Sequence, residues 1–343
     1  MKKVLIIAEA GVNHNGSLEN AKKLAKEAKN AGADYIKFQT YIAKELVCEK
    51  AKKADYQNKN DKNSTTQLEM LEKLNLTFED FKNLKKYCEK IKIKFLTTAF
   101  DLKSLKFIVD DLGVDTLKIP SGEVTNYPYL IACAKTHLPV ILSTGMCDMN
   151  EISQAVKVLK KNGTSKISIL HCTTEYPAPL ESVNLLAMKS IQDKFKCEVG
   201  YSDHTKGIDV PCYAVAMGAS IIEKHFTLDK NLPGPDHKAS LEPQELKLMI
   251  DKIREIETVL GDGDKKTQTA ELKNKPIARK SIVANCDIKK GEKFTEENLT
   301  CKRPGDGISP MKWNKIIGKK AIRDFKKDEK IEIWWIKNQK FVL

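Results

Sequence analysis

The chain has 343 residues, of which 41% are hydrophobic, and a net charge of +13. No segment approaches the roughly 18 apolar residues of a membrane span, and nine cysteines without a C-x-x-C pair support neither a disulfide framework nor a zinc ribbon, which predicts a cytoplasmic protein with free thiols. About +9 of the charge lies after residue 260 without a nucleic-acid-binding signature, so we expect neither a nucleic-acid nor a membrane partner.

Strand and helix patterns alternate along the first 260 residues. Eight short apolar runs predict strands at Val4–Ala8, Tyr35–Gln39, Lys94–Thr98, Thr116–Ile119, Val140–Ser143, Ser168–His171, Glu198–Ser202 and Ile221–His225. Helix-like spacing occurs at Leu18–Ala31, Leu102–Asp111, Tyr129–Thr136, Met149–Lys161, Val183–Lys194, Ile208–Met217 and Pro243–Leu260. About eight such repeats favour a TIM (β/α)8 barrel over an open sheet. No G-x-G-x-x-G follows the first strand, which argues against a dinucleotide-binding fold.

The second repeat is unusually long. Residues 41–64 are polar and without clear periodicity, and a helix-like pattern follows at Gln67–Leu74. A long loop on the catalytic face of a barrel is usually functional or acts as a lid.

The chain changes character after the barrel. We predict a barrel domain over residues 1–260, a polar linker over 261–280 and a small β-rich domain over 281–343, with short strands at segments such as Ser281–Ala284. Such a small domain is expected to dock on the barrel or on a second subunit.

Two histidines end the last two predicted strands. His204 and His225 lie one repeat apart, and neighbouring strands about 4.8 Å apart allow two imidazoles to share one divalent ion. Asp203 and Glu223 are candidates for carboxylates that orient these imidazoles. The alternative is a pair of hydrogen-bonded histidines in the barrel mouth.

Lysines end three strands, at Lys37, Lys118 and Lys224. Such a lysine can form a Schiff base if its pKa is depressed, or bind phosphate and carboxylate if it stays charged. Hydroxyl donors at four strand ends favour anion binding: Thr98, Ser121, Ser143 and Ser202. A further polar set suits a polyhydroxylated ligand: Glu9, Gln39, Glu123, Tyr176 and Asp236.

Together these motifs resemble the sialic acid synthase family, the phosphoenolpyruvate-dependent synthases of nine-carbon 2-keto sugar acids. The resemblance covers almost the whole chain and rests on EAGVNHNG (9–16), IKFQT (36–40), LKIPSGE (117–123), LSTGM (142–146), LHCT (170–173), YSDHT (201–205), EKHFT (223–227) and GPD (234–236). KRPGDG (302–307) resembles the antifreeze-like (SAF) domain that follows the barrel in this family.

The resemblance implies a metal-dependent condensation. His204 and His225 would bind a divalent ion, Mn²⁺ first with Mg²⁺ or Co²⁺ as alternatives, which polarises the aldehyde of an N-acylated amino sugar. Phosphoenolpyruvate would be held by Lys37, Lys118, Thr98, Ser121, Ser143 and Ser202. The sugar would contact Glu9, Gln39, Glu123, Tyr176 and Asp236, with Thr174 as a further substrate contact and one of the acids positioning water.

The resemblance also implies a domain-swapped homodimer in which Arg303 acts in the active site of the neighbouring subunit. The expected acceptor is N-acetylmannosamine, giving N-acetylneuraminate and phosphate by C–O cleavage. The alternative acceptor is 2,4-diacetamido-2,4,6-trideoxymannose, which would give legionaminic acid.

Two other classes of function compete with this interpretation. A Schiff-base aldolase or lyase would use Lys37 or Lys118 to cleave a sugar acid to pyruvate. A non-enzymatic binding protein would use its basic tail, including Lys302 and Arg303, to contact nucleic acid or another surface.

Overall fold

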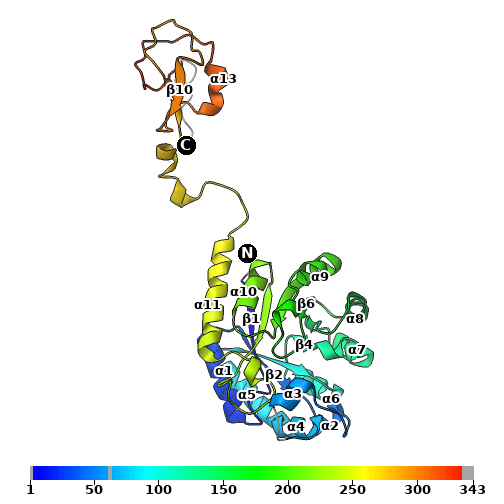
Figure 1. Cartoon of the computed structure of the whole chain (residues 1–343). Helices are drawn as coiled ribbons and strands as arrows, with labels where there is room; N and C mark the ends of the chain where they lie inside the picture. The colour runs from blue at the N-terminus through cyan, green and yellow to red at the C-terminus, as the bar shows by residue number, and fades with distance from the viewer. Residues whose placement is uncertain (1–2, 61–63, 334–343) are drawn as a thin grey trace. The chain divides into compact units, whose positions relative to one another are not determined.

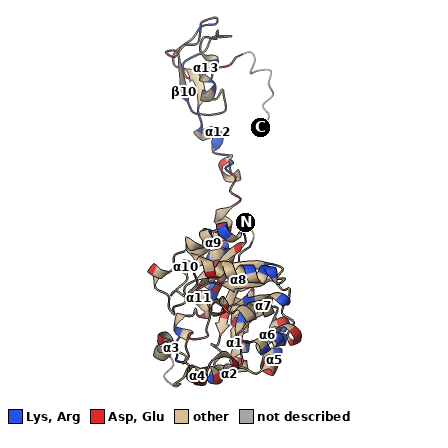
Figure 2. Cartoon of the chain, turned by 90° about the vertical axis from the view of Figure 1, so that its right-hand side faces the viewer, with Lys and Arg blue, Asp and Glu red and all other residues tan. Residues whose placement is uncertain are grey.

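The computed structural model describes residues 3–60 and 64–333. Contacts divide the chain into two units, residues 1–262 and 263–343 (Figure 1). Among the described residues, no helix is long and apolar enough to cross a membrane. Figure 2 shows Lys and Arg interspersed with Asp and Glu over the helices of the first unit.

The first unit is a (β/α)8 barrel, as the alternating pattern predicts. Its parallel strands are β1 (Leu5–Gly11), β2 (Tyr35–Thr40), β3 (Lys94–Ala99), β4 (Leu117–Ile119), β5 (Val140–Ser143), β6 (Ile167–Cys172), β7 (Glu198–Asp203) and β8 (Ile221–His225). Their order is β3-β2-β1-β8-β7-β6-β5-β4, and β3 and β4 at its two ends contact each other. The sheet is therefore closed.

Helices surround the barrel (Figure 1). They are α1 (Leu18–Ala31), α5 (Phe78–Ile91), α6 (Leu102–Lys106), α7 (Tyr127–Lys135), α8 (Met149–Lys161), α9 (Ala187–Phe195), α10 (Asp209–Ala216) and α11 (Pro243–Leu260). Side chains cap several N-termini and bond to otherwise unpaired backbone amides; Ser17 caps α1, and Asp148 with Glu151 forms a capping box on α8. The predicted bounds of α1, α8 and α11 are confirmed.

Three helical predictions differ from the structure. The pattern at 102–111 ends as a π-helix over Phe107–Asp111. The helix expected from Val183 begins only at Ala187, because Asn184 has a left-handed backbone (φ 47°) that interrupts a right-handed helix. Helix α5 was not among the predicted helices, although its buried Phe81, Leu84 and Cys88 follow helical spacing.

The long second repeat contains three short helices before α5. They are α2 (Ala43–Leu46), α3 (Asp55–Asn60) and α4 (Gln67–Leu74), whereas residues 61–63 lie outside the described part. Helices α2 and α4 contact each other. They share a small apolar cluster with Val12, Tyr41 and Phe100, separate from the main core.

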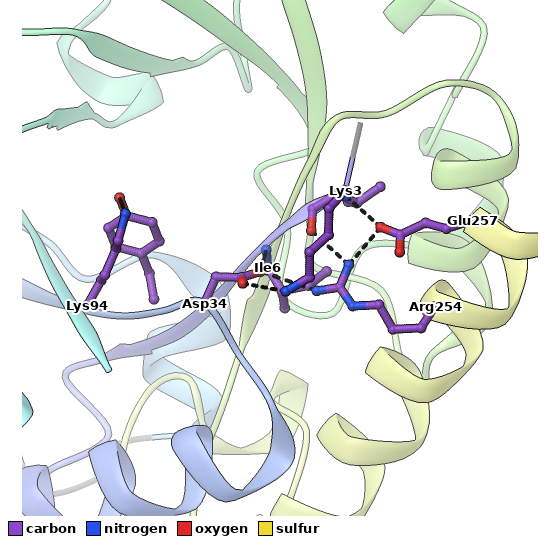
Figure 3. Close-up of polar contacts among 8 residues, drawn as sticks. Lys3, Ile6, Asp34, Lys94, Arg254 and Glu257 are labelled. Carbon is purple, nitrogen blue, oxygen red and sulfur yellow. Dashed lines mark hydrogen bonds and ion pairs between the residues drawn. The ribbon is translucent and has the colours of Figure 1, made fainter. Parts of the chain in front are cut away.

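Polar contacts fasten the last helix to the end of the barrel where the strands begin (Figure 3). Arg254 of α11 donates to the Val4 carbonyl at 2.9 Å and to Asp34 at 3.2 Å. The other donors to Asp34 are the Ile6 amide at 2.9 Å and the Lys3 ammonium at 3.0 Å. These contacts connect α11, β1 and the residue that precedes β2.

The second unit has its own core around an antiparallel pair, β9 (Ser281–Ala284) and β10 (Leu299–Lys302), with α13 (Trp313–Ile316). The segment predicted as a linker contains α12 (Lys275–Ala278), and the Gly305 amide donates to the Pro276 carbonyl at 2.6 Å. Part of residues 261–280 therefore packs with this unit. The last ten residues of the predicted domain, 334–343, lie outside the described residues.

Candidate active site

The carboxyl ends of the barrel strands open onto a cavity of about 350 Å³. Every site residue predicted within the barrel lines it: Glu9, Lys37, Gln39, Thr98, Lys118, Ser121, Glu123, Ser143, Thr174, Tyr176, Ser202, His204, His225 and Asp236. Arg303 belongs to the other unit, where its Nε donates to the Ala278 carbonyl at 3.0 Å.

The two-residue period of the strands builds this cavity in layers. Inside the barrel an apolar layer is formed by Ile7, Tyr35, Leu96, Ile141, Leu170 and Ile221. Two positions further along five of these six strands come Glu9, Lys37, Thr98, Ser143 and Glu223, all lining the cavity. The hydrophobic interior therefore forms a dry base beneath a polar layer, where electrostatic interactions are strengthened.

Four buried charged side chains form a connected group at the centre of this layer. Lys37 Nζ lies 2.7 Å from Glu9 Oε2 and 3.9 Å from Glu223 Oε2, and Lys118 Nζ lies 3.3 Å from Glu223 Oε1. Glu223, which sequence reasoning assigned to the histidines, thus bridges the two lysines. Its position two residues before His225 on one strand was the available signal, since both side chains then face the same side.

The charges in this group shift one another's pKa values. Burial alone would lower the pKa of Lys37, but Glu223 and Glu9 together raise it. Burial lowers the pKa of Lys118 in spite of Glu223, and raises the pKa of Glu9 in spite of Lys37. Lys37 is therefore a stable cation, whereas Glu9 holds a proton more readily than an ordinary carboxyl.

Hydroxyl groups surround the lysines. Thr98 accepts a hydrogen bond from Lys37 Nζ at 3.3 Å, and Ser202 donates to Glu223 at 3.0 Å. Ser121 Oγ accepts the Gly145 amide at 2.7 Å. Ser143 Oγ is buried without a hydrogen-bond partner among the described residues, as expected of a group that awaits a ligand.

Glycine at position 145 allows this close packing. A Cβ atom there would lie 2.2 Å from Thr174 Oγ1 and 3.1 Å from Ser121 Oγ. Thr174 is thereby held beside Ser121, one of the predicted phosphoenolpyruvate contacts.

The two strand-end histidines face each other, with ring centroids 5.4 Å apart. His204 Nδ1 lies 2.5 Å from the Thr173 carbonyl, and His225 Nδ1 is buried without a hydrogen-bond partner in the described part of the chain. Burial lowers the pKa of His204 to about 4 and, together with His204, lowers that of His225 well below its usual value. Two neutral imidazoles, one with an unpaired buried nitrogen, fit a divalent ion. Within the described residues, no third His, Cys, Asp or Glu completes a cluster.

The predicted sugar contacts lie around these histidines. The ring of Tyr176 lies 4.1 Å from that of His204, and Asp236 Oδ2 lies 3.9 Å from His225 Nδ1. Burial, with a contribution from Glu9, raises the pKa of Asp236 to about 7. Gln39 donates to Glu9 at 3.4 Å.

Glu123 lies in the short turn after β4, where its carboxylate accepts a hydrogen bond from Asn126 at 2.5 Å. Burial raises its pKa. The mouth of the barrel thus carries three carboxyls with raised pKa values, those of Glu9, Glu123 and Asp236.

Two expectations about strand ends are wrong. Lys224 is not in the mouth: it is fully buried, donating to Asp203 and to the Thr205 carbonyl, both at 2.5 Å. Asp203 therefore serves Lys224 and Thr205 and does not orient His204. The alternation of β-strand side chains explains both, because Lys224 and Asp203 are out of phase with the inward-facing His225 and Ser202.

Sequence reasoning also missed an apolar wall of the cavity. It consists of Leu46 and Val47 at the end of α2 and Met70, Leu71 and Leu74 of α4, and is called the insert wall below. The only sequence signal was the length of the second repeat.

Comparison with known proteins places this fold and site. Residues 24–265 match the NeuB family and residues 279–332 the SAF domain. N,N'-diacetyllegionaminic acid synthase of Campylobacter jejuni is 55% identical over 96% of this chain and 99% of its own length. The synthase of that name from Legionella pneumophila is 50% identical over 91% and 89%.

More distant relatives include human N-acetylneuraminate-9-phosphate synthase, 34% identical over 95% of this chain and 90% of that protein. The crystal structure of N-acetylneuraminic acid synthetase from Leptospira borgpetersenii has a TM-score of 0.71 at 37% identity, covering 80% of this chain and 90% of that one. The chain therefore belongs to the NeuB family. It is an enzyme of the nonulosonic acid synthase class with a C-terminal SAF domain.

Proposed function

We propose that this enzyme condenses phosphoenolpyruvate with the open-chain aldehyde of an N-acylated amino sugar. C3 of phosphoenolpyruvate attacks the aldehyde carbon and forms the new C–C bond. Water then adds at C2, and the tetrahedral intermediate breaks its C2–O bond to release inorganic phosphate. The supporting observation is one cavity that combines a lysine and hydroxyl cluster, a neutral histidine pair and three carboxyls with raised pKa values.

Phosphoenolpyruvate would bind to the lysine and hydroxyl cluster. Lys37 and Lys118 are each paired with a carboxylate, so a phosphate would compete with Glu223 for both ammonium groups. Ser143, with its unpaired hydroxyl, and Ser121 and Ser202 would donate to its remaining oxygens. Fixing the anion there orients C3 toward the histidine side of the cavity.

His204 and His225 would hold the divalent ion, for which Mn²⁺ is our first choice. When bound, such an ion supplies Lewis-acid polarisation of a carbonyl oxygen. Tyr176 packs against both rings, at 4.1 and 5.4 Å, and keeps them oriented. One carboxyl among Glu9, Glu123 and Asp236 positions the water and accepts its proton as it adds at C2; a raised pKa suits that role.

The relatives favour 2,4-diacetamido-2,4,6-trideoxymannose as the acceptor, with a legionaminic acid as product. The two proteins named as N,N'-diacetyllegionaminic acid synthases are 55% and 50% identical to this chain, whereas the human N-acetylneuraminate-9-phosphate synthase is 34% identical. N-acetylmannosamine, the first expectation from the sequence, is thus the second candidate. Arg303 of a partner subunit would complete the site in a domain-swapped homodimer, closing it against solvent.

The test is phosphate release from the purified full-length chain, with mass spectrometry of the product. Each candidate sugar is supplied with phosphoenolpyruvate and Mn²⁺. We expect phosphate only when both substrates are present, and a product heavier than the sugar by the pyruvate carbons. Phosphate release without an acceptor, or none with either sugar, would contradict the proposal.

Lys118 favours one rival, because burial lowers its pKa as in lysines that form Schiff bases. A Schiff-base aldolase would be trapped covalently by borohydride with pyruvate. Its contact with Glu223 at 3.3 Å argues for a charged lysine, so we expect no trapped adduct.

A further inference from the structure

The insert wall has no role in the chemistry proposed above. The floor of the cavity offers charges, hydroxyls and imidazoles, whereas Leu46, Val47, Met70, Leu71 and Leu74 offer only apolar surface. Two neighbours extend the wall, Val12 after β1 and Phe100 after β3. A site for a fully hydroxylated sugar has no need of such a surface, because each hydroxyl placed against it would lose water without gaining a partner.

The insert wall is held in place by contacts with the barrel. The buried Tyr41 donates from its hydroxyl to the Leu71 carbonyl at 3.1 Å, and the ring of Phe100 packs edge-on against it. The Asp101 carboxylate accepts the Ile42 amide at 2.9 Å and also caps α6. A surface fixed in this way can discriminate between ligands, since it does not rearrange to suit each one.

Two amides lie among these apolar side chains. Gln57 of α3 and Gln67 of α4 also line the cavity from the insert. An apolar surface with amide groups beside it suits a ligand end that carries a methyl group and a secondary amide. The aldehyde end of the same ligand belongs with the histidines, among the polar groups of the floor.

We propose that the insert wall is the subsite that selects the acceptor, favouring amino sugars that are deoxygenated at C6 and acylated at a second nitrogen. This inference rests on the proposed condensation and adds the element that decides its substrate. The C6 methyl and the second acetyl group would contact the wall, with Gln57 and Gln67 beside the amide. A sugar with hydroxyl groups at C4 and C6 would leave them unpaired there.

The test compares kcat/KM for three acceptors: 2,4-diacetamido-2,4,6-trideoxymannose, 2-acetamido-2,6-dideoxymannose and N-acetylmannosamine. The unmodified chain should prefer the first over the last by about tenfold to a hundredfold, with the mono-deoxy sugar between them. Val47→Thr, which adds a hydroxyl with little change of shape, and Met70→Gln should each reduce that preference severalfold. The KM for phosphoenolpyruvate should stay unchanged.

Leu68→Gln is the matched control. Leu68 packs against the same cluster without lining the cavity, so its replacement should leave the preference as it is. A preference that survives both Val47→Thr and Met70→Gln, or an unmodified chain that prefers N-acetylmannosamine, would overturn the subsite and leave the condensation standing. Absence of phosphate release with all three sugars would instead refute the proposed function, and the subsite with it.

Discussion

The two ends of the barrel treat buried polar groups differently. Where the strands begin, Asp34 accepts from the Ile6 amide, Lys3 and Arg254, and its contacts connect three elements (Figure 3). Where the strands finish, Ser143 Oγ and His225 Nδ1 are buried without hydrogen-bond partners among the described residues. One end is satisfied and stabilises the fold, whereas the other retains polar groups that a ligand can satisfy.

Lysines make the same contrast on neighbouring strands. Lys224 is fully buried, and its donors go to Asp203 and a backbone carbonyl. Lys118 is also buried, but it lines the cavity and shares Glu223 with Lys37. Burial alone therefore does not separate structural from functional lysines. The partners and the side of the strand do.

The largest expected effect on activity is the loss of the histidine pair. His204→Ala or His225→Ala should lower phosphate release at least about a hundredfold, because each removes one imidazole of the proposed ion site. Chelation should do the same, and Mn²⁺ should restore the unmodified enzyme but not the variants. Replacing His171, which contacts the Val183 carbonyl outside the cavity, should leave the response to chelation unchanged. Full activity after chelation would contradict this.

Lys118→Met and Lys224→Met should separate the two kinds of lysine. Lys118→Met should lower kcat/KM for phosphoenolpyruvate by about tenfold to a hundredfold, since it removes one charge-assisted donor. Lys224→Met leaves Asp203 buried without its cation and should lower the free energy of unfolding by about 3–5 kcal/mol. Denaturant unfolding and steady-state kinetics on both variants check this. Equal losses of activity per folded molecule would break the distinction.

Arg303→Ala should show whether the barrel mouth is completed from outside. We expect kcat/KM for the acceptor to fall about tenfold, the size of effect expected for one lost charge-assisted hydrogen bond, with little change in stability. Mixing this variant with Lys118→Met subunits should restore part of the activity if the arginine acts in the partner subunit. No recovery in the mixture would mean that Arg303 acts within its own chain.

The smallest effect on catalysis is expected at the satisfied end. Asp34→Ala removes the acceptor of the Ile6 amide and should lower the free energy of unfolding by about 1–3 kcal/mol. Steady-state kinetics at a temperature where the variant remains folded should give an unchanged kcat. A large fall in kcat would show that this end contributes to the chemistry.

Local patterns predicted most of the architecture. The bounds of α1, α8 and α11 follow from apolar spacing and N-terminal signals, and the eight strands lie where the apolar runs predict them. The barrel residues predicted for the site line one cavity because parallel strands end on the same face. Helix α5 shows a limit, because its helical spacing lay in a polar repeat that was interpreted mainly as a loop.

The sequence by itself determined the family, the barrel and its SAF domain, and a ring of polar strand ends, since these depend on short-range periodicity and on motifs. Only the tertiary structure decided which of those residues act together. Glu223 joins Lys37 to Lys118, Lys224 turns away to Asp203, and α2 and α4 bring apolar side chains over the cavity. The physical reason is that strand phase and long-range packing set the direction of a side chain.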